Sequence, residues 1–127
     1  MAKPVLIVDD DEKVRKMLGF LFSTKGFRVT NASNGREGLE ELKRERPSVV
    51  ILDIMMPEMD GISFYSEMKN DRELEDIPVL VLSALPATDN IKKLVSMPAE
   101  NYLTKPFKSA EVLGRAIELM QQASCNP

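Results

Sequence analysis

The sequence predicts a single α/β domain, a doubly wound sandwich in which helices cover both faces of a five-stranded parallel sheet. Two observations support this fold class. Three runs of four residues are continuously apolar, as strands buried on both faces of a parallel sheet are. Helical patterns lie between these runs and two weaker strand candidates, so strand and helix alternate five times along the chain.

The chain has 127 residues, enough for one sizeable core but too few for two. We expect the domain to span residues 1–122, with a polar tail at 123–127. Seventeen basic against twenty acidic residues give a net charge of -3, which argues against nucleic-acid binding. Cys125 is the single cysteine, and no apolar run approaches the roughly 20 residues of a membrane helix. These features predict a cytoplasmic protein.

The three apolar runs are expected to form strands one, three and four, at Val5–Val8, Val49–Leu52 and Val79–Leu82. Residues 27–31 alternate between apolar and polar side chains, which suits an edge strand. Residues 100–104 offer a short fifth strand.

The first helix is predicted from an apolar stripe, and Gly26 supplies its stop. The stripe consists of Val14, Met17, Leu18, Leu21 and Phe22. Caps predict four more helices: one from Asn34 to before Pro47, one from Asp60 to about Asn70, one from Thr88 to Met97, and a last one capped by Ser109.

Polar residues follow four of the five strands at the same end. Asp9 and Asp10 follow the first, Asp53 the third, Ser83 the fourth and Lys105 the fifth. Singly, each has a plain explanation as a helix cap or a solvated charge. Together they predict a site at the carboxyl edge of the sheet, where such folds bind ligands.

The acids at this edge require a cation or a proton. If strands one and three are neighbours, the carboxylates of Asp10 and Asp53 lie within roughly 5 Å and repel by about 3 kcal/mol at an effective dielectric near 20. An all-oxygen site without His or Cys ligands selects a hard ion, and Mg²⁺ is the expected one.

Four motifs in this order and spacing resemble the receiver domains of two-component signalling, the CheY-like response-regulator superfamily. The motifs are Val8–Asp11, Leu52–Gly61, Leu82–Ala84 and Tyr102–Phe107, and the resemblance covers essentially the whole chain. It implies a flavodoxin-like fold of five βα units with strand order 2-1-3-4-5.

The resemblance also assigns roles at the carboxyl edge. Asp53 would accept a phosphoryl group from a histidine kinase or phosphotransfer protein. Mg²⁺ would be bound by Asp10, Asp53 and the Met55 backbone carbonyl, with Asp9 acting through water. Such a protein is not an enzyme in the ordinary sense, because it catalyses only its own phosphorylation and dephosphorylation.

Further roles concern the response to phosphorylation. Lys105 and Ser83 would contact the phosphoryl group, and Ser83 and Tyr102 would form the switch. The surface of helix four, strand five and helix five would then control a downstream target or output domain. We expect no nucleic-acid or membrane partner for this domain, and a monomer or a weak phosphorylation-dependent dimer.

Three other interpretations remain open from the residues. A haloacid-dehalogenase-like phosphatase would use Asp9 as nucleophile, but Lys13 stands where that family needs Thr or Val. A degenerate receiver would act as an interaction module without phosphorylation, an interpretation that Pro98 before the fifth strand keeps open. An FMN module would need Gly, Ser or Thr in the acidic first loop.

Overall fold

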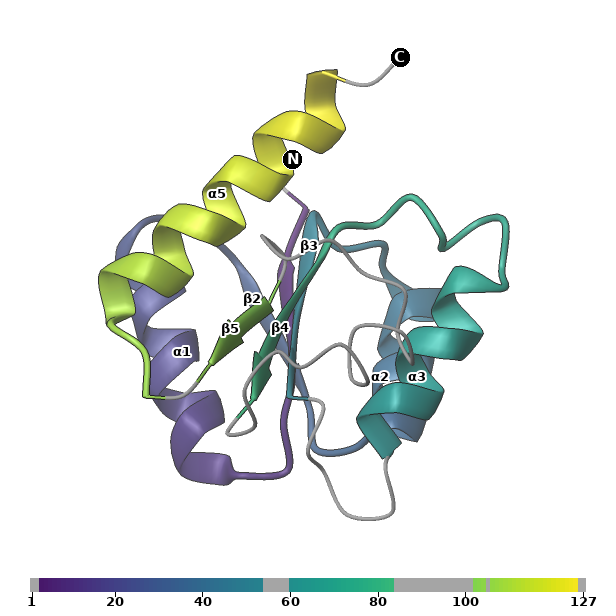
Figure 1. Ribbon diagram of the computed structural model, residues 1–127, viewed down its shortest axis with the longest axis horizontal. Helices are drawn as coiled ribbons and strands as arrows, with labels where there is room; N and C mark the ends of the chain where they lie inside the picture. Colours follow the sequence, from purple (N-terminus) through teal and green to yellow (C-terminus); the bar gives the residue numbers. More distant parts are fainter. Residues whose placement is uncertain (1–2, 54–59, 84–101, 105, 126–127) are drawn as a thin grey trace.

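Five parallel strands form one sheet, in the order β2-β1-β3-β4-β5 (Figure 1). The computed structural model describes residues 3–53, 60–83, 102–104 and 106–125. The strands are β1 Val5–Val8, β2 Val29–Ala32, β3 Val49–Asp53, β4 Val79–Ser83 and β5 Tyr102–Thr104. The predicted fold class and strand order are confirmed, and β2 takes the expected edge position.

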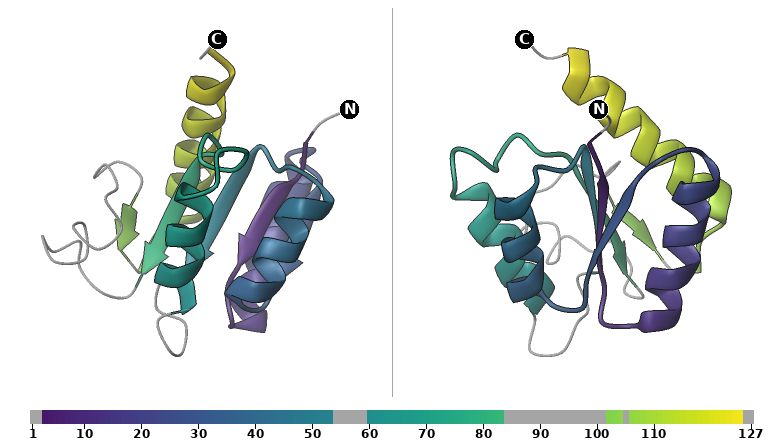
Figure 2. Two further views of the ribbon diagram at one scale, coloured as in Figure 1. Left: turned by 90° about the vertical axis from the view of Figure 1, so that its right-hand side faces the viewer. Right: turned by 180° about the vertical axis from the view of Figure 1, so that it is seen from behind.

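Helices cover both faces of the sheet. The described helices are α1 Glu12–Thr24, α2 Gly35–Arg44, α3 Asp60–Lys69 and α5 Ser109–Cys125. Figures 1 and 2 show α1 and α5 on one face and α2 and α3 on the other. The predicted helix from Thr88 to Met97 lies outside the described residues. None of the described helices combines the length and apolar character that a transmembrane span needs.

Each face of the sheet has its own apolar core, because successive residues of a strand point to opposite faces. Leu6, Val8, Val50 and Leu52 belong to the cluster beneath α2 and α3, together with Phe64 of α3. The intervening residues of β1 and β3 belong to the other cluster, beneath α1 and α5: Val5, Ile7, Val49 and Ile51. Burial on both faces explains why these strands are continuously apolar.

Local signals in the sequence define both ends of α1. Asp11 caps its start, because the Asp11 carboxylate accepts a hydrogen bond from the Lys13 N–H at 2.9 Å. At its end, Gly26 adopts φ 88°, and Phe27 N–H donates to the Phe22 carbonyl at 3.1 Å. The Phe22 and Phe27 rings pack edge to face at 6.0 Å. The predicted stop at Gly26 is therefore confirmed as a Schellman motif.

Three expectations about the helices are wrong in detail. Met17 is 44% exposed, because it lies about 100° around the helix from the buried Leu18, at the margin of the apolar face. Ser109 is the first residue of α5, so Lys108 takes the capping position. The backbone N–H of Lys108 donates a hydrogen bond to the Glu111 carboxylate at 3.3 Å. Asp60, expected to cap the third helix, is likewise the first residue of α3. The N-cap prediction for Asn34 is confirmed, because its side chain accepts a hydrogen bond from the Glu37 N–H at 2.9 Å.

α5 continues to Cys125, into the segment expected as a polar tail. The domain boundary at residue 122 stays a prediction. The C-terminal turns of α5 project beyond the sheet, away from the edge where the strands end (Figures 1 and 2).

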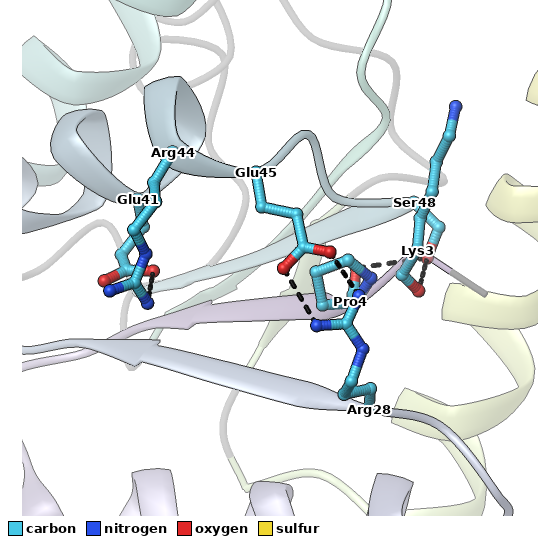
Figure 3. A network of polar contacts seen from close by, with 7 residues as sticks. All are labelled: Lys3, Pro4, Arg28, Glu41, Arg44, Glu45 and Ser48. Atoms are coloured by element: carbon cyan, nitrogen blue, oxygen red, sulfur yellow. Dashed lines mark hydrogen bonds and ion pairs between the residues drawn. The ribbon is translucent and has the colours of Figure 1, made fainter. Parts of the chain in front are cut away.

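Polar contacts tie the elements together at the amino-terminal end of the sheet (Figure 3). Arg28, before β2, forms a two-bond ion pair with Glu45 after α2. The hydrogen bond from Arg28 lowers the pKa of Glu45, and that from Glu45 raises the pKa of Arg28. Ser48 N–H donates to the Pro4 carbonyl at 2.9 Å, which joins the starts of β1 and β3. The residues that link the elements at this end of the sheet are therefore separate from those at the carboxyl edge.

Gly38 allows α2 to approach α3 and β1 closely. A Cβ at this position would lie 2.8 Å from a Phe64 ring carbon and 3.2 Å from a Val8 methyl. Gly38→Ala is expected to lower the free energy of unfolding by about 1–3 kcal/mol, because the buried ring must shift. Urea denaturation measures this change.

Gly114 of α5 provides a matched control for that substitution. Nothing lies within 4 Å of a Cβ built there. Gly114→Ala is expected to raise the free energy of unfolding by about 0.5–1 kcal/mol, since alanine restricts the unfolded chain. Equal effects at the two glycines would contradict the packing account.

Candidate functional site

Three carboxylates converge at the carboxyl edge of the sheet. Asp9, Asp10 and Asp53 each place a carboxylate oxygen within 4.8 Å of the other two. Asp9 is 2% exposed and Asp53 6% exposed, whereas Asp10 is exposed to solvent. The convergence expected from the sequence is confirmed for these three residues.

The register of the sheet explains the convergence. Val8 of β1 pairs with Leu52 of β3, so Asp9 and Asp53 both come one position later on neighbouring strands. Asp53 in turn pairs with Leu82 of β4, which Ser83 follows. The parallel strands therefore bring Asp9, Asp53 and the backbone of Ser83 to one edge.

Hydrogen bonds hold Asp9 at three of its groups. Its N–H donates to the Ala32 carbonyl at 3.1 Å, and its carboxylate accepts from the Asp11 N–H at 2.9 Å. Its carbonyl oxygen accepts from Nη1 of the half-buried Arg15 at 2.5 Å. The loop between β1 and α1 is thus anchored to β2 on one side and to α1 on the other.

The remaining predicted site residues are placed unevenly. Tyr102 lies in β5 with only 5% of its surface exposed, within the cluster beneath α2 and α3. Ser83 ends β4 and pairs with Thr104, which directly precedes Lys105. Lys105 and Met55 themselves lie outside the described residues, and their roles stay predictions.

Sequence reasoning did not identify Arg15. Its contact with Asp9 spans six residues and joins a side chain to a backbone carbonyl. No periodicity predicts such a contact, and a lone arginine early in a helix reads as a solvated charge. The only available signal was its position on the helix that directly follows the acidic loop.

The chemistry of these ligands fits a hard divalent cation. Carboxylate oxygens are the ligands that Mg²⁺ prefers, and the chain contains no histidine. Two of the three carboxylates are buried, so their mutual repulsion is poorly screened by solvent. A bound cation would offset this repulsion, which makes the cluster a candidate magnesium site.

Comparison with known families bears on two of the three open interpretations. A family model described as the response regulator receiver domain matches residues 5–117. The chain belongs to this receiver family. The match does not favour a dehalogenase-like phosphatase or an FMN module. Receiver domains act in phosphorelay signalling, so the function class expected from the sequence is confirmed.

Individual relatives agree with this assignment. The chain is 35% identical to the response regulator MprA of Mycolicibacterium vanbaalenii, over 98% of this chain and 53% of the relative. It is 39% identical to a probable transcriptional regulator, ycf27, of Guillardia theta, over 94% and 46% of the two chains. The chain thus spans about half the length of the curated relatives it matches.

A solved structure matches the chain over nearly its full length. The receiver domain of the Francisella response regulator 1452 superposes with a TM-score of 0.82 at 32% identity. The alignment covers 94% of this chain and 98% of that domain. The similarity therefore extends over nearly the whole domain.

Removing one carboxylate from the cluster should stabilise the receiver domain when no divalent cation is bound. In the presence of a chelator, Asp10→Asn is expected to raise the free energy of unfolding by about 1 kcal/mol. The gain stays below the roughly 3 kcal/mol of an unscreened carboxylate pair because solvent screens Asp10. Urea denaturation in EDTA measures the effect.

Glu118→Gln on α5 is the matched control, since it removes an exposed carboxylate far along the chain from the cluster. It should leave stability nearly unchanged. With Mg²⁺ added, wild type should gain more stability than Asp10→Asn. A destabilised Asp10→Asn protein in EDTA would show that repulsion is not what this residue contributes.

Proposed function

We propose that Asp53 is the phosphoacceptor of a two-component phosphorelay and that a histidine kinase or phosphotransfer protein is the donor. The observation that carries this proposal is the convergence of Asp53 with Asp9 and Asp10 at the carboxyl edge of the sheet. Asp53 is nearly buried, and its two acidic neighbours are the groups that a cation-dependent transfer to a carboxylate needs.

Asp53 acts as the nucleophile in this proposal. One of its carboxylate oxygens attacks the phosphorus of a phosphohistidine, the P–N bond breaks, and the imidazole leaves with a proton. The product is an acyl phosphate, which water later hydrolyses. This sequence has no histidine, so the donor imidazole must lie outside it.

Asp10, Asp53 and the Met55 carbonyl would hold Mg²⁺ directly, with Asp9 holding it through water. When bound, the ion supplies positive charge that stabilises the oxygens of the transferring group. Lys105 would add a second positive charge, and Ser83 would donate a hydrogen bond to the attached phosphoryl group. Catalysis of this kind is limited to the domain's own phosphorylation and dephosphorylation.

The curated relatives extend well beyond the matched region, and two of them are named as transcriptional regulators or response regulators. We therefore propose that the domain controls an output domain or a separate target protein in the cytoplasm. It would do so as a monomer or a weak dimer, through the surface of helix four, β5 and α5.

Labelling with a small phosphodonor tests the assignment of Asp53. Acetyl phosphate or phosphoramidate with Mg²⁺ should add one phosphoryl group to the wild type, because Asp53 is the nucleophile. Asp53→Asn should add none, since an amide oxygen is a poor nucleophile. Intact-mass spectrometry counts the groups, and Glu118→Gln should label like the wild type. Equal labelling of Asp53→Asn and wild type would overturn the assignment.

The proposed switch predicts that phosphorylation changes residues beyond the site. The acyl phosphate brings about two negative charges where Asp53 had one, so Ser83 should be drawn toward it and the neighbourhood of Tyr102 should respond. Amide NMR with the phosphoryl mimic beryllofluoride plus Mg²⁺ should show shifts across residues 88–118. Ser83→Ala should reduce these shifts. Changes confined to the strand ends would contradict the switch.

A further inference from the structure

Arg15 makes a charged contact with the backbone of the acidic loop. Its Nη1 donates to the carbonyl oxygen of Asp9 at 2.5 Å. This oxygen belongs to the peptide group that joins Asp9 to Asp10. A bond to it therefore orients the plane between two of the three clustered acids.

The base of the Arg15 side chain is itself fixed. Its backbone N–H donates to the Asp11 carbonyl at 3.0 Å in the first turn of α1, and Asp11 also caps that helix. The helix thus holds the start of the side chain while the guanidinium reaches back to the loop that precedes it. A contact between a helix and its own preceding loop makes the loop conformation less free.

A carboxylate on α2, that of Glu37, interacts electrostatically with Arg15. Glu37 accepts hydrogen bonds from the Ser33 hydroxyl at 2.6 Å and the Ser33 N–H at 2.8 Å, and these bonds lower its pKa. The charge of Arg15 lowers the Glu37 pKa further. At neutral pH Glu37 is therefore ionised, and its charge attracts Arg15, which also donates to the Asp9 carbonyl.

We propose that Arg15 is a positioning residue for the carboxylate cluster. Through the Asp9 carbonyl it keeps Asp9 and Asp10 directed toward Asp53, in the arrangement that binds a divalent cation. This inference rests on the proposed function, because it concerns the same cation site. Arg15 contacts the backbone and is no ligand of the ion.

Positioning and simple charge predict opposite effects when Arg15 is neutralised. Removing a positive charge near three carboxylates makes the site more negative, which alone would strengthen cation binding. Losing the hydrogen bond lets the peptide group between Asp9 and Asp10 reorient, and this reorientation weakens cation binding. The direction of the change in Mg²⁺ affinity therefore distinguishes a positioning role of Arg15 from a simple charge effect.

The experiment measures the dissociation constant for Mg²⁺ by amide NMR titration of the whole chain, without any phosphodonor. Arg15→Gln is expected to raise this constant about tenfold, the low end of what loss of an outer-shell partner costs. Arg15→Lys keeps the charge but has a shorter, single-point donor, so a rise of about threefold is expected. Any weakening in Arg15→Lys cannot come from lost charge.

Arg44→Gln is the matched control. Arg44 lies at the end of α2, 72% exposed, in an ion pair with Glu41 at 2.9 Å. The Arg44→Gln variant should bind Mg²⁺ with the same dissociation constant as the wild type. If Arg15→Gln does not fold, the expected threefold rise of the Mg²⁺ dissociation constant in Arg15→Lys tests the positioning role. Unchanged or tighter binding in the Arg15 variants, or equal weakening in Arg44→Gln, would overturn the inference.

The titration of the wild type separates this inference from the proposed function. If the wild type binds Mg²⁺ and labels at Asp53 while the Arg15 variants bind as well as it does, only the positioning role fails. If the wild type binds no Mg²⁺, both fail.

Discussion

The parallel register between β1 and β3 is the constraint on which the site depends. Val8 pairs with Leu52, so Asp9 and Asp53 leave the two strands side by side. A slip of one residue would turn every side chain of β3 to the opposite face. Such a slip would exchange the contributions of β3 to the two cores. Apolar residues with no role in the chemistry therefore determine where the acids meet.

Function and stability oppose each other at this edge. Two nearly buried carboxylates beside a third repel one another, and the fold must tolerate this repulsion whenever no cation is bound. Besides the hydrogen bonds of Asp9, contacts far from this edge stabilise the fold, in the cores on both faces of the sheet and in the polar links at its amino-terminal end. The fold can therefore tolerate electrostatic repulsion among the carboxylates at this edge. Binding of a cation or attachment of a phosphoryl group changes that repulsion.

The sequence predicted those parts of the fold that depend on short-range pattern. Continuous apolar runs identified β1, β3 and β4, and the acids that follow them identified the cluster. Met17 was misplaced because an apolar residue at the margin of a helix face satisfies the periodicity without being buried. Arg15 was missed for another reason: its contact depends on the path of the loop between β1 and α1, which leaves no repeat in the sequence.

The same sheet offers a short route from Asp53 to Tyr102. Asp53 pairs with Leu82, and Leu82 pairs with Leu103, the neighbour of Tyr102. Along β5, Tyr102 points to the core beneath α2 and α3 while Leu103 points to the other core. The structure holds the Tyr102 side chain inward, which is one of the two arrangements that the proposed switch requires. Phosphorylation would only have to favour one of two arrangements, by as much as it binds that arrangement more tightly.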